Sequence, residues 1–287
     1  MMNLTSPSQV KAWCIENGFH PNKVLGQNFL IDRNALVAIV DAGLEGIEKV
    51  PGESLNILEI GPGLGVLTEE LLKRGGFVTA IEKDPVLAAR LSAEAKTRST
   101  TEAWWKNLTV IEGDALPILS SPPSENFFAG FDCMVSNLPY QAGTRILLEL
   151  TERRTIPAMT VLVQTEVAER LAAGPGTKTR GLAGVLAQLD YDVEIVRKVG
   201  ANCFWPRPEI GSSVVRLRRH HRCEALTAEE RRTFKMLVKR GFEQRRKQLG
   251  SIFKGVIEST ARAEELANED WLTLVGLMLH HKGRRLL

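Results

Sequence analysis

Short apolar runs alternate with helix-forming runs from about residue 55 to residue 217, and this alternation strongly constrains the possible folds. The apolar run at 55–60 enters a glycine-rich turn, and a helical pattern follows it up to Gly75 and Gly76. Similar runs recur further along the chain, at 77–84, 108–116, 131–140, 158–171, 193–204 and 212–218. Strands that alternate with helices predict an α/β fold whose mostly parallel sheet is covered by helices on both faces.

The pattern changes after Leu217, where the sequence becomes helical to its end. Thr227 and Glu230 have the spacing of a capping box, which predicts the start of a helix. With 287 residues, the chain is long enough for one large and one smaller domain. We predict a Rossmann-like α/β domain with an N-terminal helical extension at 1–218 and a smaller all-helical domain at 219–287.

The charge is distributed unevenly between these two parts. The segment from Arg216 to the end contains 17 Lys and Arg against 9 Asp and Glu, whereas the preceding part is net acidic. The basic residues cluster at 216–222 and 245–247. This asymmetry favours contact of the C-terminal domain with a polyanion such as nucleic acid, and a solvated basic helical surface is the alternative.

Several classes of protein and site are disfavoured by the composition. The four cysteines are scattered without a CxxC pair, which favours reduced thiols and a cytoplasmic location. The two His-His pairs lack further ligands at suitable spacing, so we expect no metal site. No apolar run is long enough to span a membrane, and the N-terminus lacks the pattern of a signal peptide.

Glycines and acidic residues follow the successive strands. The stretch EIGPGLG places glycines at Gly61, Gly63 and Gly65, a spacing that departs from the dinucleotide-binding fingerprint. It has the layout seen in S-adenosylmethionine-dependent methyltransferases. Glu82 ends the next strand, where it could accept both ribose hydroxyls, and Asp114 follows the third strand, where it could accept from an adenine amine. Acidic side chains at successive strand ends therefore predict a nucleoside-bearing cofactor.

The stretch SNLPY follows the fourth of these strands. The side-chain oxygen of Asn137 and the carbonyl of Leu138 could accept from a base amine, in a turn that Pro139 fixes. Tyr140 could stack on the base, and Phe204, before a proline-rich segment, could clamp it from the other side. The alternatives are an ordinary strand-ending turn and a core phenylalanine.

Motifs along nearly the whole chain resemble those of the KsgA-type ribosomal RNA adenine N6,N6-dimethyltransferases. They are LGQNFL (25–30), EIGPGLGVLT (59–68), IEKD (81–84), GDAL (113–116), NLPY (137–140), QTEVAERLAA (164–173), FWPRPEIGSS (204–213), FEQRRKQL (242–249) and RAEELANED (262–270). The resemblance implies dimethylation of two adjacent adenines in a 16S (small-subunit) rRNA hairpin, within an assembling 30S particle. It implies S-adenosyl-L-methionine as cofactor, with contacts from Asn28, Leu30, Gly61, Glu82, Asp114 and Asn137. We expect a monomer.

Two departures from the family pattern lie on the expected RNA side. NLPY continues as QAGT at 141–144, and the Gly-rich loop with Lys178 and Arg180, expected to be mobile, lacks the usual Tyr-Gly-Arg stretch. Three rival functions share the first domain: a large-subunit rRNA adenine methyltransferase, a DNA adenine methyltransferase, and an assembly or transcription factor without catalysis. The C-terminal motifs disfavour the first two, and the intact NLPY and Glu82 disfavour the third.

Overall fold

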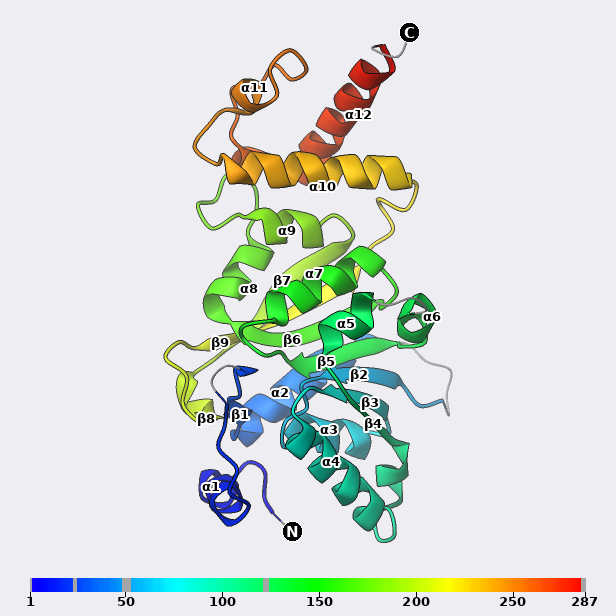
Figure 1. Cartoon of the computed structure of the whole chain (residues 1–287), viewed down its shortest axis with the longest axis vertical. Coiled ribbons are helices and arrows are strands. Elements are labelled where there is room, and N and C mark those ends of the chain that lie inside the picture. Colours follow the sequence, from blue (N-terminus) through cyan, green and yellow to red (C-terminus); the bar gives the residue numbers. More distant parts are fainter. Residues whose placement is uncertain (1, 23–24, 48–52, 121–123, 285–287) are drawn as a thin grey trace. The chain divides into compact units, whose positions relative to one another are not determined.

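The computed structural model describes residues 2–22, 25–47, 53–120 and 124–284 (Figure 1). These residues form two compact units, one of residues 1–168 and 194–218 and one of residues 169–193 and 219–287. The second unit thus takes in residues 169–193 together with the C-terminal helices. Among the residues described, every helix is too short or too polar to cross a bilayer.

A seven-stranded sheet with the order β4-β3-β2-β5-β6-β9-β7 organises the α/β fold. Its five strands from β4 to β6 are parallel, and β9 runs antiparallel to β6, so the prediction of a mostly parallel sheet is confirmed. The strands are β2 (Asn56–Ile60), β3 (Phe77–Glu82), β4 (Leu108–Glu112), β5 (Cys133–Asn137), β6 (Ala158–Gln164), β7 (Tyr191–Val199) and β9 (Ser212–Arg219).

The strand order reverses between β2 and β5. Because right-handed crossovers lead outward from both strands, helices are placed on opposite faces of the sheet, and ligands in such sheets bind at the point of reversal. The covering helices are α2 (Arg33–Leu44), α3 (Val66–Lys73), α4 (Pro85–Arg98), α5 (Ala115–Ser120), α6 (Ser124–Ala129) and α7 (Gly143–Arg153), with a 3-10 turn at Ala103–Asn107. The carboxyl ends of β2 and β5 are the strand ends that precede the glycine-rich turn and NLPY.

The N-terminal segment forms α1 (Pro7–Glu16) and the short strand β1 (Phe29–Leu30). β1 pairs antiparallel with β8 (Phe204–Trp205), so that Leu30 lies opposite Phe204. This pairing connects two segments that are far apart in sequence, and local periodicity does not predict it. It places the QNFL segment beside the proline-rich FWPRP segment.

The second unit has a hydrophobic core of its own, in which Phe234, Leu237 and Trp271 are buried. The predicted capping box is confirmed, because Thr227 and Glu230 exchange hydrogen bonds at the start of α10. A side chain at Gly241 would lie 2.7 Å from the ring of Trp271, so this close approach requires glycine. The helices grouped wholly in this unit are α9 (Leu182–Ala187), α10 (Ala228–Glu243), α11 (Leu249–Ile252) and α12 (Asn268–Arg284), and α8 (Thr165–Ala172) contributes its second half.

The Gly-rich loop, which we expected to be mobile, is anchored at one end by the buried Arg180. The Arg180 side chain is 1% exposed and donates hydrogen bonds to the carbonyl oxygen of Ala173 and the side-chain oxygens of Gln188 and Asn268. Sequence reasoning missed this because a charged residue among glycines usually lies in solvent. Arg180 therefore joins separate segments within the second unit, and its side chain is not exposed for contact with a ligand.

Candidate active site

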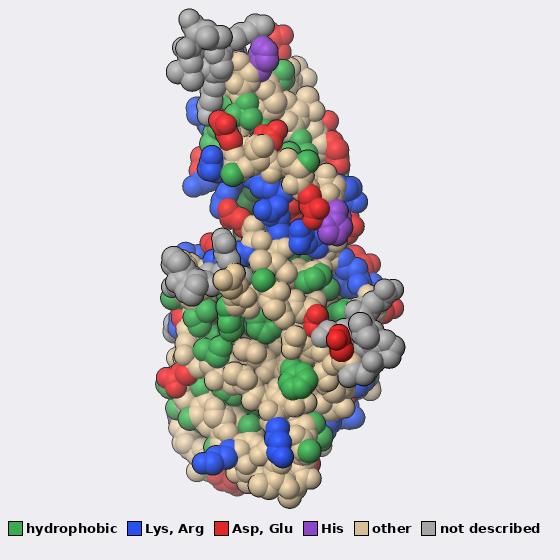
Figure 2. All heavy atoms as spheres, turned by 90° about the vertical axis from the view of Figure 1, so that its right-hand side faces the viewer, with side chains coloured by type: hydrophobic (Ala, Val, Ile, Leu, Met, Phe, Trp, Pro, Cys, Tyr) green, Lys and Arg blue, Asp and Glu red, His purple; other side chains and the backbone are tan. Residues whose placement is uncertain are grey.

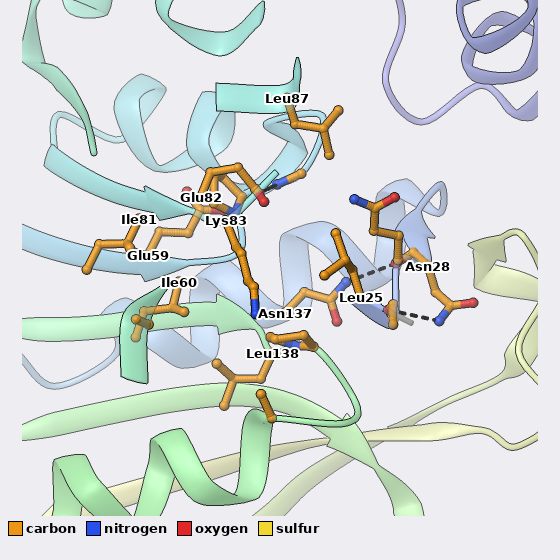
Figure 3. A pocket seen from close by; sticks show the side chains of 18 of the residues that line it. Leu25, Asn28, Glu59, Ile60, Ile81, Glu82, Lys83, Leu87, Asn137 and Leu138 are labelled. Atoms are coloured by element: carbon orange, nitrogen blue, oxygen red, sulfur yellow. Dashed lines mark hydrogen bonds between the residues drawn. The ribbon is translucent and has the colours of Figure 1, made fainter. Parts of the chain in front are cut away.

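A pocket opens at the carboxyl ends of the parallel strands, on the side where β2 and β5 diverge (Figure 3). Its lining includes residues from the segment before β1, the glycine-rich turn, the ends of β3 and β4, and NLPY. Of the residues predicted to act in the site, the structure brings ten into this lining: Asn28, Leu30, Gly61, Gly63, Glu82, Asp114, Asn137, Leu138, Pro139 and Tyr140.

The glycine-rich turn after β2 has a backbone that side chains would not tolerate. Gly61, Gly63 and Gly65 have φ angles of 70°, 58° and 85°, in the left-handed region that favours glycine. A Cβ atom on Gly63 would lie 3.2 Å from the ring of Phe29. The turn therefore keeps the backbone at the pocket wall, which allows a ligand to approach it closely.

Glu82 links the end of β3 to this turn. Its Oε2 accepts a hydrogen bond from the backbone N–H of Gly63 at 2.9 Å, and its Oε1 accepts one from the N–H of Asp84 at 2.8 Å. Burial raises the pKa of this carboxyl, and the two N–H donors partly oppose the rise. Each carboxylate oxygen has a second lone pair, so Glu82 can still accept from a bound hydroxyl.

A second carboxyl, that of Glu59, lies beneath the turn and lines the same pocket. It is 1% exposed, and the hydroxyl of Thr68 lies 2.6 Å from its Oε2. Burial raises the pKa of Glu59 to about 8, and the charge of Glu82 adds to the rise. Burial at the pocket floor therefore favours the protonated form of this carboxyl.

Asp114 is paired with a residue that the sequence did not single out. Its Oδ2 lies 2.7 Å from the Lys83 ammonium, and its Oδ1 accepts from the backbone N–H of Leu116 at 3.0 Å. The hydrogen bond from Lys83 lowers the pKa of Asp114. Asp114 therefore stays ionised as an acceptor at the pocket edge, and Lys83 lines the pocket with it.

Asn137 is held by the segment that precedes β1. Its side-chain Nδ2 donates a hydrogen bond to the carbonyl oxygen of Asn28 at 3.2 Å, and the Asn28 side chain donates to the carbonyl of Gly26 (Figure 3). Gly26 itself lies against NLPY, because a Cβ there would be 3.0 Å from the backbone nitrogen of Tyr140. These contacts fix the orientation of the Asn137 amide.

The rest of NLPY forms a tight turn into α7. The carbonyl of Pro139 accepts hydrogen bonds from the N–H groups of Ala142 and Gly143, at 3.2 and 2.7 Å. The Tyr140 hydroxyl lies 2.7 Å from that of Ser212, which anchors the ring to the FWPRPEIGSS segment. The turn therefore presents Leu138 and Tyr140 to the pocket in fixed positions.

Phe204 does not join the other predicted site residues. Its side chain is 2% exposed in the core cluster that also holds Leu30 and Leu36, and it is absent from the pocket lining. The strand pairing of β8 with β1 explains this, since it places Phe204 against Leu30. The structure thus fits the alternative of a core phenylalanine, and it does not present Phe204 for stacking.

The second unit carries exposed basic side chains on α10 and the segment after it, mixed with acidic ones (Figure 2). Several basic residues of the predicted 216–222 cluster are ion-paired: Arg216 with Glu45 and Glu194, Arg219 with Glu224, and Arg222 with Asp192. The cations exposed on α10 and in the segment after it, up to residue 247, are Arg232, Lys235, Lys239, Arg240, Arg246 and Lys247. Within the described ranges, no three His, Cys, Asp or Glu side chains are grouped as metal ligands.

Comparison with known proteins agrees with this arrangement. The family model of ribosomal RNA adenine dimethylase matches residues 18–273. The chain belongs to the ribosomal RNA adenine dimethylase family. It is similar to ribosomal RNA small subunit methyltransferase A of Geobacillus thermodenitrificans, with 38% identity over 293 residues that cover 99% of this chain and 93% of that protein. The protein of the same name from Corynebacterium efficiens is 36% identical over 91% of this chain and 87% of its own length.

Two solved structures share the fold of this chain. A dimethyladenosine transferase from Plasmodium falciparum matches with a TM-score of 0.69 and 25% identity, over 88% of this chain and 97% of that one. The 23S rRNA methyltransferase ErmE matches with a TM-score of 0.60 and 25% identity, over 87% and 99% of the two chains. The Rossmann-like methyltransferase sheet with C-terminal helices is therefore confirmed.

Sequence reasoning missed three residues at the pocket of this dimethylase. Lys83 follows Glu82 directly, and a lysine after a strand is usually solvated. Glu59 lies within the predicted strand before the glycines, and nothing in its local sequence distinguishes it from other strand residues. Leu4 also lines the pocket, because the N-terminal segment folds back onto it, and no local signal in the sequence indicates this long-range contact.

Proposed function

We propose that this family member dimethylates the N6 amines of two adjacent adenines in a 16S rRNA hairpin, within an assembling 30S particle. The observation that supports this most directly is the bond from Asn137 to Asn28, which orients an amide at the edge of a pocket with acidic strand ends. The curated relatives named as small-subunit methyltransferases support the choice of RNA. A cytoplasmic location and a monomer follow as parts of the proposal.

The residues of the pocket suit S-adenosyl-L-methionine, which supplies an electrophilic methyl group when bound. Gly61 and Gly63 line the pocket with backbone alone, and Glu82 and Asp114 offer acceptors for ribose hydroxyls and the adenine amine. Asn28 and Leu30 complete the wall from the other side. We assign cofactor binding to these residues and to Asn137.

The NLPY turn would prepare the target amine. An amine on a purine is a poor nucleophile because its lone pair is delocalised into the ring. Since the NH₂ of Asn137 donates to Asn28, its Oδ1 is the atom left to accept from the amine, together with the Leu138 carbonyl. These acceptors would favour a tetrahedral nitrogen, whose lone pair would then be free to accept the methyl group that bound S-adenosyl-L-methionine supplies, and the proton of the methylated amine would pass to solvent.

Tyr140 is the residue that we assign to base stacking. Tyr140 lines the pocket, and its hydroxyl is anchored by Ser212. Aromatic rings commonly hold a base that has left its stack. Because Phe204 is buried, stacking is proposed for Tyr140 alone.

The basic C-terminal helices would bind the rRNA backbone. Exposed Lys and Arg side chains on α10 and after it are suited to phosphate contacts, which position an enzyme without reading sequence. We retain residues 219–287 as the proposed rRNA-binding domain. The buried Arg180 and the ion-paired Arg216, Arg219 and Arg222 are not assigned to RNA contact.

Transfer of label from radiolabelled cofactor tests this function. The substrates are small subunits from a strain that lacks the methylation, matched large subunits and duplex DNA, and the labelled nucleotides are then mapped. We expect label on two adjacent adenines of small-subunit rRNA. Label confined to large-subunit RNA or to DNA would refute the choice of substrate, and no label on any of them would refute the activity.

A further inference from the structure

Arg90 on α4 contacts both the glycine-rich turn and the N-terminal helix α1. From α4, its guanidinium donates a hydrogen bond to the carbonyl of Leu64 at 2.8 Å, within the turn. The same guanidinium lies 5.1 Å from the ring centroid of Trp13 on α1 and pairs with Glu94 at 2.7 Å. One side chain therefore contacts the pocket turn, the N-terminal helix and an acidic partner at the same time.

A series of aromatic contacts also connects the N-terminal helix with the glycine-rich turn. The Trp13 ring lies 5.6 Å from that of Phe19, and Phe19 lies 6.3 Å from Phe29. Phe29 in turn occupies the space beside Gly63, where a Cβ would be 3.2 Å from its ring. The buried residues of the N-terminal segment, Leu4 among them, form one hydrophobic cluster with Phe29, Leu64 and Leu87 of the pocket.

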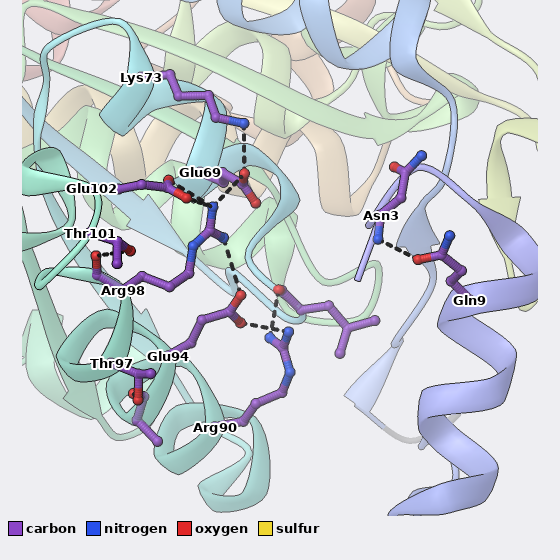
Figure 4. A network of polar contacts seen from close by, with 12 residues as sticks. Asn3, Gln9, Glu69, Lys73, Arg90, Glu94, Thr97, Arg98, Thr101 and Glu102 are labelled. Carbon is purple, nitrogen blue, oxygen red and sulfur yellow. Dashed lines mark hydrogen bonds and ion pairs between the residues drawn. The ribbon is translucent and has the colours of Figure 1, made fainter. Parts of the chain in front are cut away.

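A network of ion pairs holds the Arg90 side chain in place. Its side chain is 14% exposed, and its partner Glu94 also contacts Arg98, which pairs with Glu69 and Glu102 (Figure 4). A planar guanidinium can donate in two directions while its face stacks on a ring, and a lysine ammonium cannot reproduce that set of contacts. The Arg90 contacts therefore depend on the identity of this side chain.

We propose that Arg90 is a positioning residue for binding of the methyl donor. Its side chain fixes the Leu64 carbonyl and holds the N-terminal segment against the pocket. This inference rests on the proposed function, since it concerns the affinity of the same pocket. Arg90 does not line the pocket and acts through Leu64 and Trp13. Its loss should weaken cofactor binding and leave the amine-orienting NLPY turn unchanged.

The test compares Arg90→Met with Arg98→Met in the full-length protein. Both substitutions remove a largely buried guanidinium from the same ion-pair network, but only Arg90 contacts the turn. Calorimetry with S-adenosyl-L-homocysteine measures affinity, and initial rates on small subunits give KM and kcat below the unfolding temperature of each variant. We expect Arg90→Met to raise Kd and the KM for the methyl donor by about tenfold, with kcat at saturating donor and the KM for RNA within about twofold of wild type. Arg98→Met should leave Kd within about twofold.

Equal losses of affinity in the two variants, or an unchanged Kd in Arg90→Met, would overturn the inference. If Arg90→Met does not fold, Trp13→Leu removes the other side of the contact and should raise Kd without changing kcat, and an unchanged Kd there is equally contradictory. Arg90→Lys should recover only part of the affinity. If the wild-type protein binds the ligand and transfers methyl groups, a contradictory result in these variants refutes the role of Arg90 and leaves the proposed function standing. If it does neither, the proposed function itself fails.

Discussion

The side-chain nitrogen of Asn137 donates a hydrogen bond to the backbone carbonyl of Asn28, which lies 109 residues earlier in the chain. This contact joins NLPY to the QNFL segment, and it determines which end of the Asn137 amide can accept from a substrate. The two motifs therefore act as one structural unit at the pocket.

Glu82→Gln should weaken cofactor binding by about tenfold or more. Each carboxylate oxygen of Glu82 accepts from a backbone N–H, of Gly63 or of Asp84. Glutamine has one acceptor oxygen, so its NH₂ would face the other N–H without a hydrogen bond. Calorimetric titration with S-adenosyl-L-homocysteine measures the loss. Glu112→Gln is a matched control, since Glu112 lies opposite Glu82 in the sheet register and is exposed. A similar loss of affinity in both variants would contradict the assignment.

Gly63→Ala should lower both stability and cofactor affinity. Its positive φ strains any side chain by about 1–2 kcal/mol, and the added Cβ meets Phe29 at 3.2 Å. Gly75→Ala has the same backbone strain, but its Cβ meets nothing within 4 Å. Urea unfolding should therefore show a loss in both variants, while calorimetry should show weaker binding in Gly63→Ala alone. Normal affinity in Gly63→Ala would argue against close approach of the ligand to the turn.

Stability should fall as the pH rises from about 5 to 8, because the pKa of Glu59 is raised to about 8 from an ordinary value of 4.5. Across this window the folded protein binds a proton that the unfolded chain has released, so ionisation favours unfolding. Burial raises the pKa of Glu82 as well, which acts in the same direction. Urea unfolding at pH 6 and pH 8 should show the fall in wild type and a smaller one in Glu59→Gln. An identical pH dependence in both proteins would show that ionisation of Glu59 does not cause the loss of stability.

Neutralising exposed cations on the C-terminal helices should weaken RNA binding without changing cofactor affinity. Lys239→Ala combined with Arg246→Ala should lower the slope of log affinity against log salt by about one for each lost phosphate contact. Filter binding of small-subunit rRNA across a salt series measures this slope. Arg222→Ala is the control, because Arg222 already pairs with Asp192. An unchanged slope in the double variant would exclude this surface from RNA binding.

Local sequence signals predicted much of this site because parallel strands bring their ends together. Gly61, Glu82, Asp114 and Asn137 each follow a predicted strand, and the sheet order places them around one pocket. What the sequence did not show are contacts made by distant segments. The burial of Phe204 follows from the pairing of β8 with β1, and that of Arg180 from acceptors on other loops and on α12. The position of Leu4 depends on the packing of α1, which periodicity does not encode.

Asn137→Ala tests the central claim most directly, when single-turnover methyl transfer to small subunits and cofactor affinity are measured on the same preparation. Removal of the oriented amide oxygen should reduce transfer by about 100-fold or more, as the loss of one preorganised group does elsewhere, while cofactor binding persists at least in part. N6,N6-dimethyladenosine in digests of the rRNA, quantified by mass spectrometry, gives the rate. Transfer at a near-normal rate by Asn137→Ala would contradict the account of how this site activates the amine.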